Sequence, residues 1–140
     1  MAANPDSQLA PPEFSSFLSD LEAAIERSRS MLGLPDNWDD DGGGRIEPAT
    51  WDRAASFLRD NAERLLLSSH AVIGPPVISP VGDGSVDIHW RDTRRQLLIN
   101  VPAEAEEPIE FFGDDRGRTV VKGTIDPSVS TLWLLMWLTR

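Results

Sequence analysis

The chain has 140 residues, 40% of them hydrophobic, and a net charge of −10, which predicts one folded domain and excludes an acidic disordered chain. The absence of cysteine excludes disulfide bonds, thiolate metal sites and cysteine nucleophiles. Because the acids are spread along the sequence, we expect no direct binding to nucleic acid or to anionic membranes, whose phosphates would repel them, and a basic protein partner remains open.

Residues 1–12 are rich in proline, alanine and polar side chains and predict a flexible tail, which leaves 13–140 as a single domain. The start of the chain has neither the basic region nor the apolar stretch of a secretion signal. No apolar run approaches the roughly 18 residues of a membrane span. The expectation is therefore a cytoplasmic protein.

Two helices are predicted next. Apolar residues recur at helical spacing from Phe14 to Leu32, and Gly33 with Pro35 ends that pattern. A second helix begins near Pro48, which suits a first helical turn, and continues to about Ser68. Its apolar stripe consists of Trp51, Ala54, Ala55, Leu58, Ala62 and Leu65.

After residue 76 the hydrophobic period changes from 3.6 to 2, which indicates strands. Four or five short strands follow, and the connections between them are too short for parallel crossovers. Alternation predicts an antiparallel meander, and together with the helices an α+β fold. The residues expected to face the helices are Val86, Ile88, Trp90, Leu97, Ile99, Val101, Ile109 and Phe111.

The last segment, SVSTLWLLMWLTR, is predicted to be a helix that Asp126 caps and Pro127 opens. One broad stripe, with Val129, Leu132, Trp133, Met136 and Trp137, is expected to cover the sheet. Leu134, Leu135 and Leu138 then point away from the sheet, where a surface helix should be polar. Burial inside the domain is the alternative, and so is a buried strand. We predict that these leucines contribute to a homodimer or partner interface.

The segment LPDNWDDDGGGRIEP joins the two helices and is unusually acidic and glycine-rich. A calcium loop that starts at Asn37 would need a bidentate glutamate at position 48, which is Pro48. The phosphate-binding glycine patterns do not match either. The prediction is a structural connection, in which Asn37, Asp39 and Gly42 form turns and Trp38 anchors the loop on the core.

This segment, the following EPATWDRAASFL and the later PPVISPVGDGSVDIHW resemble a group of short uncharacterised bacterial proteins. The shared pattern is Asn-Trp-Asp-Gly with a further glycine, a helix that begins with proline, and proline before Asp-Gly-Ser. The chain has Asp40 where that pattern has glycine. The matching residues are Asn37, Trp38, Asp39, Pro48, Pro80, Asp83, Gly84 and Trp90. The resemblance implies no activity.

No catalytic pattern is present. His70 and His89 fall in different elements, and the glycines around Ser85 do not have the spacing of a nucleophile elbow. Arg91, Arg94 and Arg95 surround one hairpin and form a candidate basic patch for a phosphate or carboxylates, or pair with acids of their own chain, such as Asp87 or Glu110.

By elimination the sequence favours a non-enzymatic, acidic protein-binding module, similar in type to immunity proteins, antitoxins and small adaptors, with no cofactor. The first alternative is an acidic mimic of nucleic acid that inhibits a DNA-binding protein. The second alternative is a small hydrolase or a ligand-binding domain.

Overall fold

The computed structural model describes residues 12–126 and 131–139. The helices are α2 (Pro12–Ser28), the short 3₁₀ helix η1 (Arg29–Gly33), α3 (Pro48–Ser69) and α4 (Leu132–Thr139). The strands are β1 (Val77–Pro80), β2 (Val86–Arg91), β3 (Gln96–Val101), β4 (Ile109–Asp114) and β5 (Val120–Ile125). This order is the predicted α+β arrangement. Most of the tail predicted for 1–12 lies outside the described residues.

The five strands form one sheet in the order β1-β2-β3-β4-β5, and every neighbouring pair is antiparallel. The predicted meander is therefore confirmed. The register places Ile88 opposite Ile99 and Ile99 opposite Phe111, so that apolar residues form continuous rows on one face. A slip of one residue would bury Asp87 and Asn100 instead, which is why alternation fixes this register.

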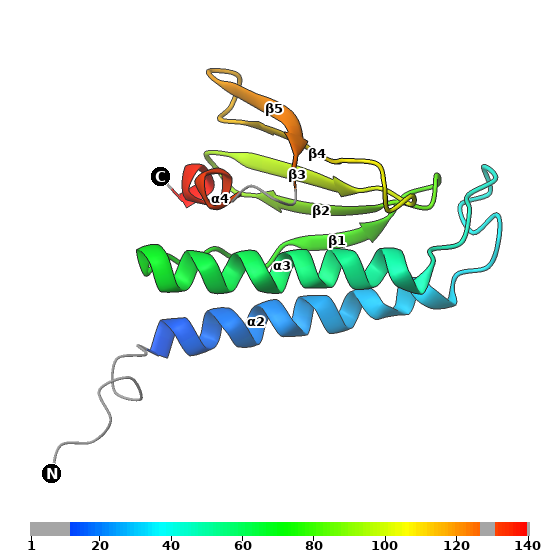
Figure 1. Ribbon diagram of the computed structural model, residues 1–140, viewed down its shortest axis with the longest axis horizontal. Coiled ribbons are helices and arrows are strands. Elements are labelled where there is room, and N and C mark those ends of the chain that lie inside the picture. The colour runs from blue at the N-terminus through cyan, green and yellow to red at the C-terminus, as the bar shows by residue number, and fades with distance from the viewer. Residues whose placement is uncertain (1–11, 127–130, 140) are drawn as a thin grey trace, which may run out of the picture.

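The two long helices lie side by side along one face of the sheet, next to β1 and β2 (Figure 1). The sheet extends well beyond them, and in this view β5 lies farthest from α2. Helix α4 contacts α3 and covers part of the same face farther along the sheet. The opposite face of the sheet has no helix against it in the described part of the chain (Figure 1).

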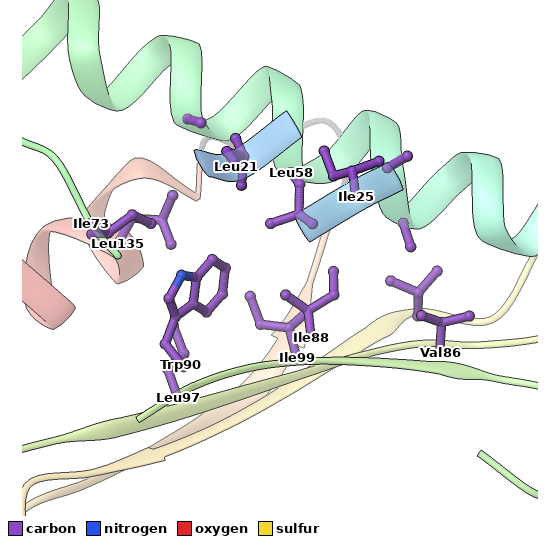
Figure 2. Close-up of a cluster of buried hydrophobic side chains, with 14 of the residues drawn as sticks. Leu21, Ile25, Leu58, Ile73, Val86, Ile88, Trp90, Leu97, Ile99 and Leu135 are labelled. Carbon is purple, nitrogen blue, oxygen red and sulfur yellow. The ribbon is translucent and has the colours of Figure 1, made fainter. Parts of the chain in front are cut away.

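The core lies between the helices and this sheet face (Figure 2). Of the eight strand residues predicted to face the helices, seven are buried and Ile109 is half-buried. All six residues of the predicted stripe on α3 are also buried. Figure 2 shows Leu21, Ile25 and Leu58 pointing from the helices toward Ile88 and Ile99 of the sheet.

The predicted orientation of the last helix was wrong. Leu134, Leu135 and Leu138 are buried, with 1%, 2% and 6% of their surface exposed, whereas Trp133 and Met136 are 53% and 40% exposed. Figure 2 shows Leu135 beside Ile73, directed toward the core. The three leucines are therefore core residues of the single chain and are not accessible to a partner.

The physical reason is that α4 is apolar on every side, so its sequence contains no signal for which face turns inward. Its contact with α3 decides the orientation: the Thr131 hydroxyl, just before the helix, donates a hydrogen bond to the side-chain oxygen of Asn61. The described helix begins at Leu132. The predicted cap at Asp126 does not begin it, and Pro127 and Val129 lie outside the described residues.

Candidate functional site

The reversals of a meander fall alternately at its two ends. At one end lie the β1–β2 turn, residues 81–85, and the β3–β4 loop, residues 102–108. The connection 36–47 between the helices reaches the same end (Figure 1). These three segments together contain nine acidic residues and one arginine. We call them the acidic end of the sheet.

Close backbone contacts hold the three segments together. The Gly44 N–H donates to the carbonyl of Gly82 at 2.9 Å, which joins the helix connection to the β1–β2 turn. All three segments meet at Gly84: a Cβ added there would lie 3.4 Å from Cβ of Ala103 and 3.6 Å from the carbonyl oxygen of Arg45. Gly84 also has a φ of 88°, which favours glycine for a second reason.

The polar side chains of the helix connection bond to its own backbone. Asn37 Oδ1 accepts from the Gly42 N–H at 2.6 Å, and Asp39 Oδ1 accepts from the N–H groups of Asp41 (3.0 Å) and Gly43 (2.7 Å). These backbone hydrogen bonds lower the pKa of the Asp39 carboxyl, with the Asp41 N–H as the largest cause. The oxygens face amide hydrogens, as the structural role predicted for this loop requires.

The indole of Trp38 donates to the carbonyl of Gly44 at 2.8 Å. The side chain is half-buried. It therefore stabilises the loop mainly through this hydrogen bond and less through packing in the core. The prediction that Trp38 anchors the loop on the core therefore overestimates how far its side chain turns inward. Its hydrogen bond and the Asn37 and Asp39 contacts together fix the path of the loop.

Three residues of this loop have the left-handed backbone conformation, namely Asn37 (φ 61°), Asp40 (φ 61°) and Gly42 (φ 80°). Glycine adopts this conformation without cost, and asparagine and aspartate tolerate it better than other residues. Asp40 therefore lies in a backbone conformation that favours glycine, asparagine or aspartate.

The β1–β2 turn contains a small polar network. The buried Ser85 hydroxyl donates to Asp83 Oδ1 at 2.5 Å and accepts from the Asn100 amide at 2.8 Å, and the same amide donates to Asp87 at 2.9 Å. The Ser85 hydroxyl, and secondly its N–H, lower the pKa of the Asp83 carboxyl. Ser85 is only 1% exposed, so its hydroxyl stabilises the turn and is not presented to a substrate.

Beside this network the acidic end encloses a cleft of about 340 Å³. Asp83 lines it from the β1–β2 turn, Glu104 and Glu107 from the β3–β4 loop, and Glu110 from β4. All four residues are exposed. The cleft therefore presents carboxylates from three separate parts of the chain to solvent, with no basic residue in its lining.

Sequence reasoning missed this group because its members are up to 27 positions apart and belong to no motif. A signal was nevertheless present. In any antiparallel meander the first and third connections lie at the same end, so Asp83 and the glutamates of residues 102–108 had to be neighbours once the strands were assigned. The acids that are scattered in sequence are thus gathered in space.

The opposite end of the sheet carries the β2–β3 turn, residues 92–95, and the β4–β5 turn, residues 115–119. These turns contain four arginines and two aspartates. The side chain of Arg116 joins them by donating to the carbonyl of Thr93 at 2.9 Å. The two ends of the sheet therefore differ in charge: one end is acidic and the other is mildly basic.

Of the predicted basic patch, Arg91 and Arg94 are exposed, whereas Arg95 turns toward α4. Its guanidinium lies 5.0 Å from the ring centre of Trp137 and donates to the carbonyl of the same residue. Asp92 Oδ1 accepts from the N–H groups of Arg95 and Arg94, which lower the pKa of that carboxyl, with the Arg95 N–H as the largest cause. The neighbouring acid is thus Asp92, not Asp87 or Glu110.

A second cleft, of about 390 Å³, lies between α3 and the strands β3 to β5. Its apolar lining consists of Phe57, Val101, Ile109 and Ile125. Charged residues of α3 also line it. Its buried amide, Asn61, accepts a hydrogen bond from Thr131 and donates to the carbonyl of Phe57. These polar groups are used within the fold.

The two histidines lie in different elements. His70 ends α3 with a φ of 53°, and His89 lies on the outer sheet face, where its ring nitrogen is 3.1 Å from Gln96 Oε1. Within residues 12–126 and 131–139, no three histidine or acidic side chains gather closely enough to hold a metal ion. None of the described helices has the length and hydrophobicity needed to cross a membrane.

Comparison with models of protein families, with curated proteins and with solved structures gave no significant match.

Proposed function

We propose that the protein is a non-enzymatic binding module that takes a basic partner protein at its acidic end. The observation that carries this proposal is the cleft of about 340 Å³ that Asp83, Glu104, Glu107 and Glu110 line, with no basic residue in the lining. Gathered like charges raise the local potential, attract a partner of opposite charge and select against other partners.

The internal hydrogen bonds of the acidic end support the proposal. The loop 36–44 and the turn 81–85 are held by their own side chains, so ordering them costs little when a partner binds. The carboxylates that line the cleft are exposed, and the Asp83 carboxylate is held by the N–H and the hydroxyl of Ser85. A preorganised acidic surface of this kind suits protein recognition.

The test is capture from the native host with two baits of equal net charge. The site variant carries Glu104→Gln, Glu107→Gln and Glu110→Gln. The control carries Asp20→Asn, Glu26→Gln and Glu63→Gln, which change exposed acids of α2 and α3. A protein partner retained by wild type and control should bind the site variant about 10 to 100 times more weakly, because each exposed charge pair contributes roughly 0.5–1 kcal/mol.

The affinity of the purified partner should also fall with salt, as expected for exposed charges. Equal affinities of the two variants, measured by titration calorimetry, would contradict the acidic end as the binding site.

A nucleic-acid mimic is the second candidate, and one observation favours it: acids that are dispersed in sequence lie on one end of the fold. Such a mimic occupies the DNA site of its partner. If the captured partner binds DNA, a DNA duplex should then compete with this protein for it. If the partner binds the DNA duplex and this protein at the same time, the protein is not a nucleic-acid mimic, and the general protein-binding proposal is unaffected.

A further inference from the structure

Strand β5 forms one edge of the sheet, and β1 forms the other. The β1 edge is short, with four residues, and has Pro75, Pro76 and Pro80 in or beside it. Proline cannot donate to a new strand, so this edge is poorly suited to further pairing. The β5 edge has six residues, VVKGTI, without a proline. Among the described residues, β5 is the edge better suited to accept another strand.

Exposed apolar side chains lie on both faces of the sheet near β5, whose Gly123 pairs with Phe111 of β4. On the helix side, Trp133 and Met136 of α4 are 53% and 40% exposed. Trp133 packs edge-to-face on Phe111 of β4, with ring centres 5.7 Å apart. On the outer face, Val120 is 54% exposed and Phe112 is 41% exposed. Exposed apolar residues on both sides of an open strand are typical of an interface.

We propose that a second copy of this chain binds at β5, so that two sheets join by antiparallel pairing of β5 with its symmetry mate. Antiparallel self-pairing generates a closed two-fold dimer, in which the same surface serves both copies. The exposed face of α4 in each copy then covers the joint on the helix side. This dimer does not depend on which partner the acidic end binds.

Charge complementarity within the fold favours a second copy as the occupant. Strand β5 starts at the basic 115–119 turn and ends at Ile125, which pairs with Ile109 beside the acidic 102–108 loop. When two such strands pair antiparallel, the basic turn of each copy lies toward the acidic end of the other. Opposite charges thus meet at both ends of the joint, which favours association and fixes its direction.

Lys122, in the middle of β5, limits the register. It faces outward with Val120 and Thr124, because the strand alternates and Ile125 faces the core. A two-fold axis at Lys122 would place the two lysines opposite each other, which is unfavourable. An axis at Val121 or at Gly123 instead pairs Lys122 with Val120 or Thr124. The proposed dimer uses one of these two registers.

The first test measures the mass of the full chain by light scattering over a range of concentrations. We expect wild type to have twice the mass of one chain at high concentration. Trp133→Glu with Met136→Glu should reduce this to a folded monomer, because both positions are exposed and their exposed faces form the joint. The control, Leu67→Glu with Val77→Glu, changes two positions exposed to 71% and 66% elsewhere and should leave the dimer intact.

The second test uses the absence of cysteine to locate the axis. A single cysteine is introduced at Val121, Lys122 or Gly123, with Val77→Cys as the control on the other edge. Under mild oxidation, Val121→Cys or Gly123→Cys should give a disulfide-linked dimer in higher yield than Lys122→Cys and Val77→Cys. A wild-type monomer at all concentrations, or a dimer that cross-links best at Val77→Cys, would overturn the proposal.

Discussion

At the scale of single residues, side-chain oxygens in the acidic connection between α2 and α3 accept hydrogen bonds from loop N–H groups that would otherwise need backbone carbonyls. Asn37 and Asp39 accept hydrogen bonds from loop amides, and Gly43 leaves room for the Asp39 carboxylate. A Cβ added at Gly43 would lie 2.6 Å from Asp39 Oδ1, closer than real atoms approach. The side chains that looked like metal ligands in the sequence thus form the internal contacts of a turn.

The backbone of Asp40 leads to the first prediction. Asp40→Val should lower the free energy of unfolding by about 1–2 kcal/mol, because a β-branched residue is strained at a φ of 61°. Asp40→Gly should leave it unchanged or raise it slightly, since glycine adopts this φ freely. Urea denaturation measures both. Asp41→Val is the matched control, because Asp41 is equally exposed and is not left-handed, and a similar loss there would refute backbone strain as the cause.

The Asp83 carboxyl leads to a prediction of pH dependence. Its pKa is lowered in the folded state, chiefly by the Ser85 hydroxyl, so the folded state binds fewer protons than the unfolded state in acid. The stabilisation is complete above the ordinary aspartate pKa of about 3.9 and is lost as the pH falls through the folded value. We therefore expect Asp83→Asn to reduce the loss of stability between about pH 4 and pH 2.

Thermal unfolding across this pH range provides the measurement. Asp115→Asn is a suitable comparison, because Asp115 also accepts a backbone hydrogen bond, from Thr119, but lies in the turn at the other end of the sheet. Identical pH profiles of Asp83→Asn and wild type would show that the Ser85 contact contributes nothing to acid stability.

At the scale of elements, α4 shows how tertiary contacts orient a helix that has no polar face. Its buried side chains contact the core that α3 and the sheet form, and its exposed face carries Trp133 and Met136. Helices α2 and α3 differ from it, because each has an apolar stripe that forms its buried face, with Leu18 of α2 as an exposed exception. Amphipathic helices could be oriented from sequence, and the uniformly apolar helix could not.

This orientation predicts unequal costs along α4. Leu134→Ala should lower the free energy of unfolding by about 2–5 kcal/mol, as for other fully buried leucines. Trp133→Ala should cost about 1 kcal/mol, because Trp133 is half-exposed and loses mainly its edge contact with Phe111. Guanidinium denaturation at low protein concentration, where a dimer dissociates, separates these values. A larger loss at Trp133 than at Leu134 would mean that the helix is turned the other way.

At the scale of the whole molecule, the meander gathers acids that are dispersed in sequence at one end of the sheet and arginines at the other end. Connections that alternate along the chain separate into two ends, so the acids of 36–47, 81–85 and 102–108 meet and the arginines of 92–95 and 115–119 lie opposite. Both proposals follow from this separation of charge. The acidic end offers a surface to a basic partner, and the opposite ends favour antiparallel pairing of two copies.

The sequence by itself determined the α+β class, the meander, its register and the core stripes of the long helices, because alternation with period 2 or 3.6 requires one face to be buried. It also indicated a structural loop at Asn37 and Asp39, since these residues form local turns whatever surrounds them. These are local signals, readable within one element or one connection.

Only the tertiary structure decided which face of α4 is buried, and that the helix connection 36–47 joins the β1–β2 turn at the acidic end. Leu134, Leu135 and Leu138 are as apolar as their neighbours, so their burial depends on contacts with α3 and the sheet. Asp83 and Glu107 belong to no shared motif: the meander places their connections at the same end, and only the folded structure shows that both line one cleft. Turns and apolar faces within one element can be predicted from the sequence, whereas the acidic cleft exists only after the chain has folded.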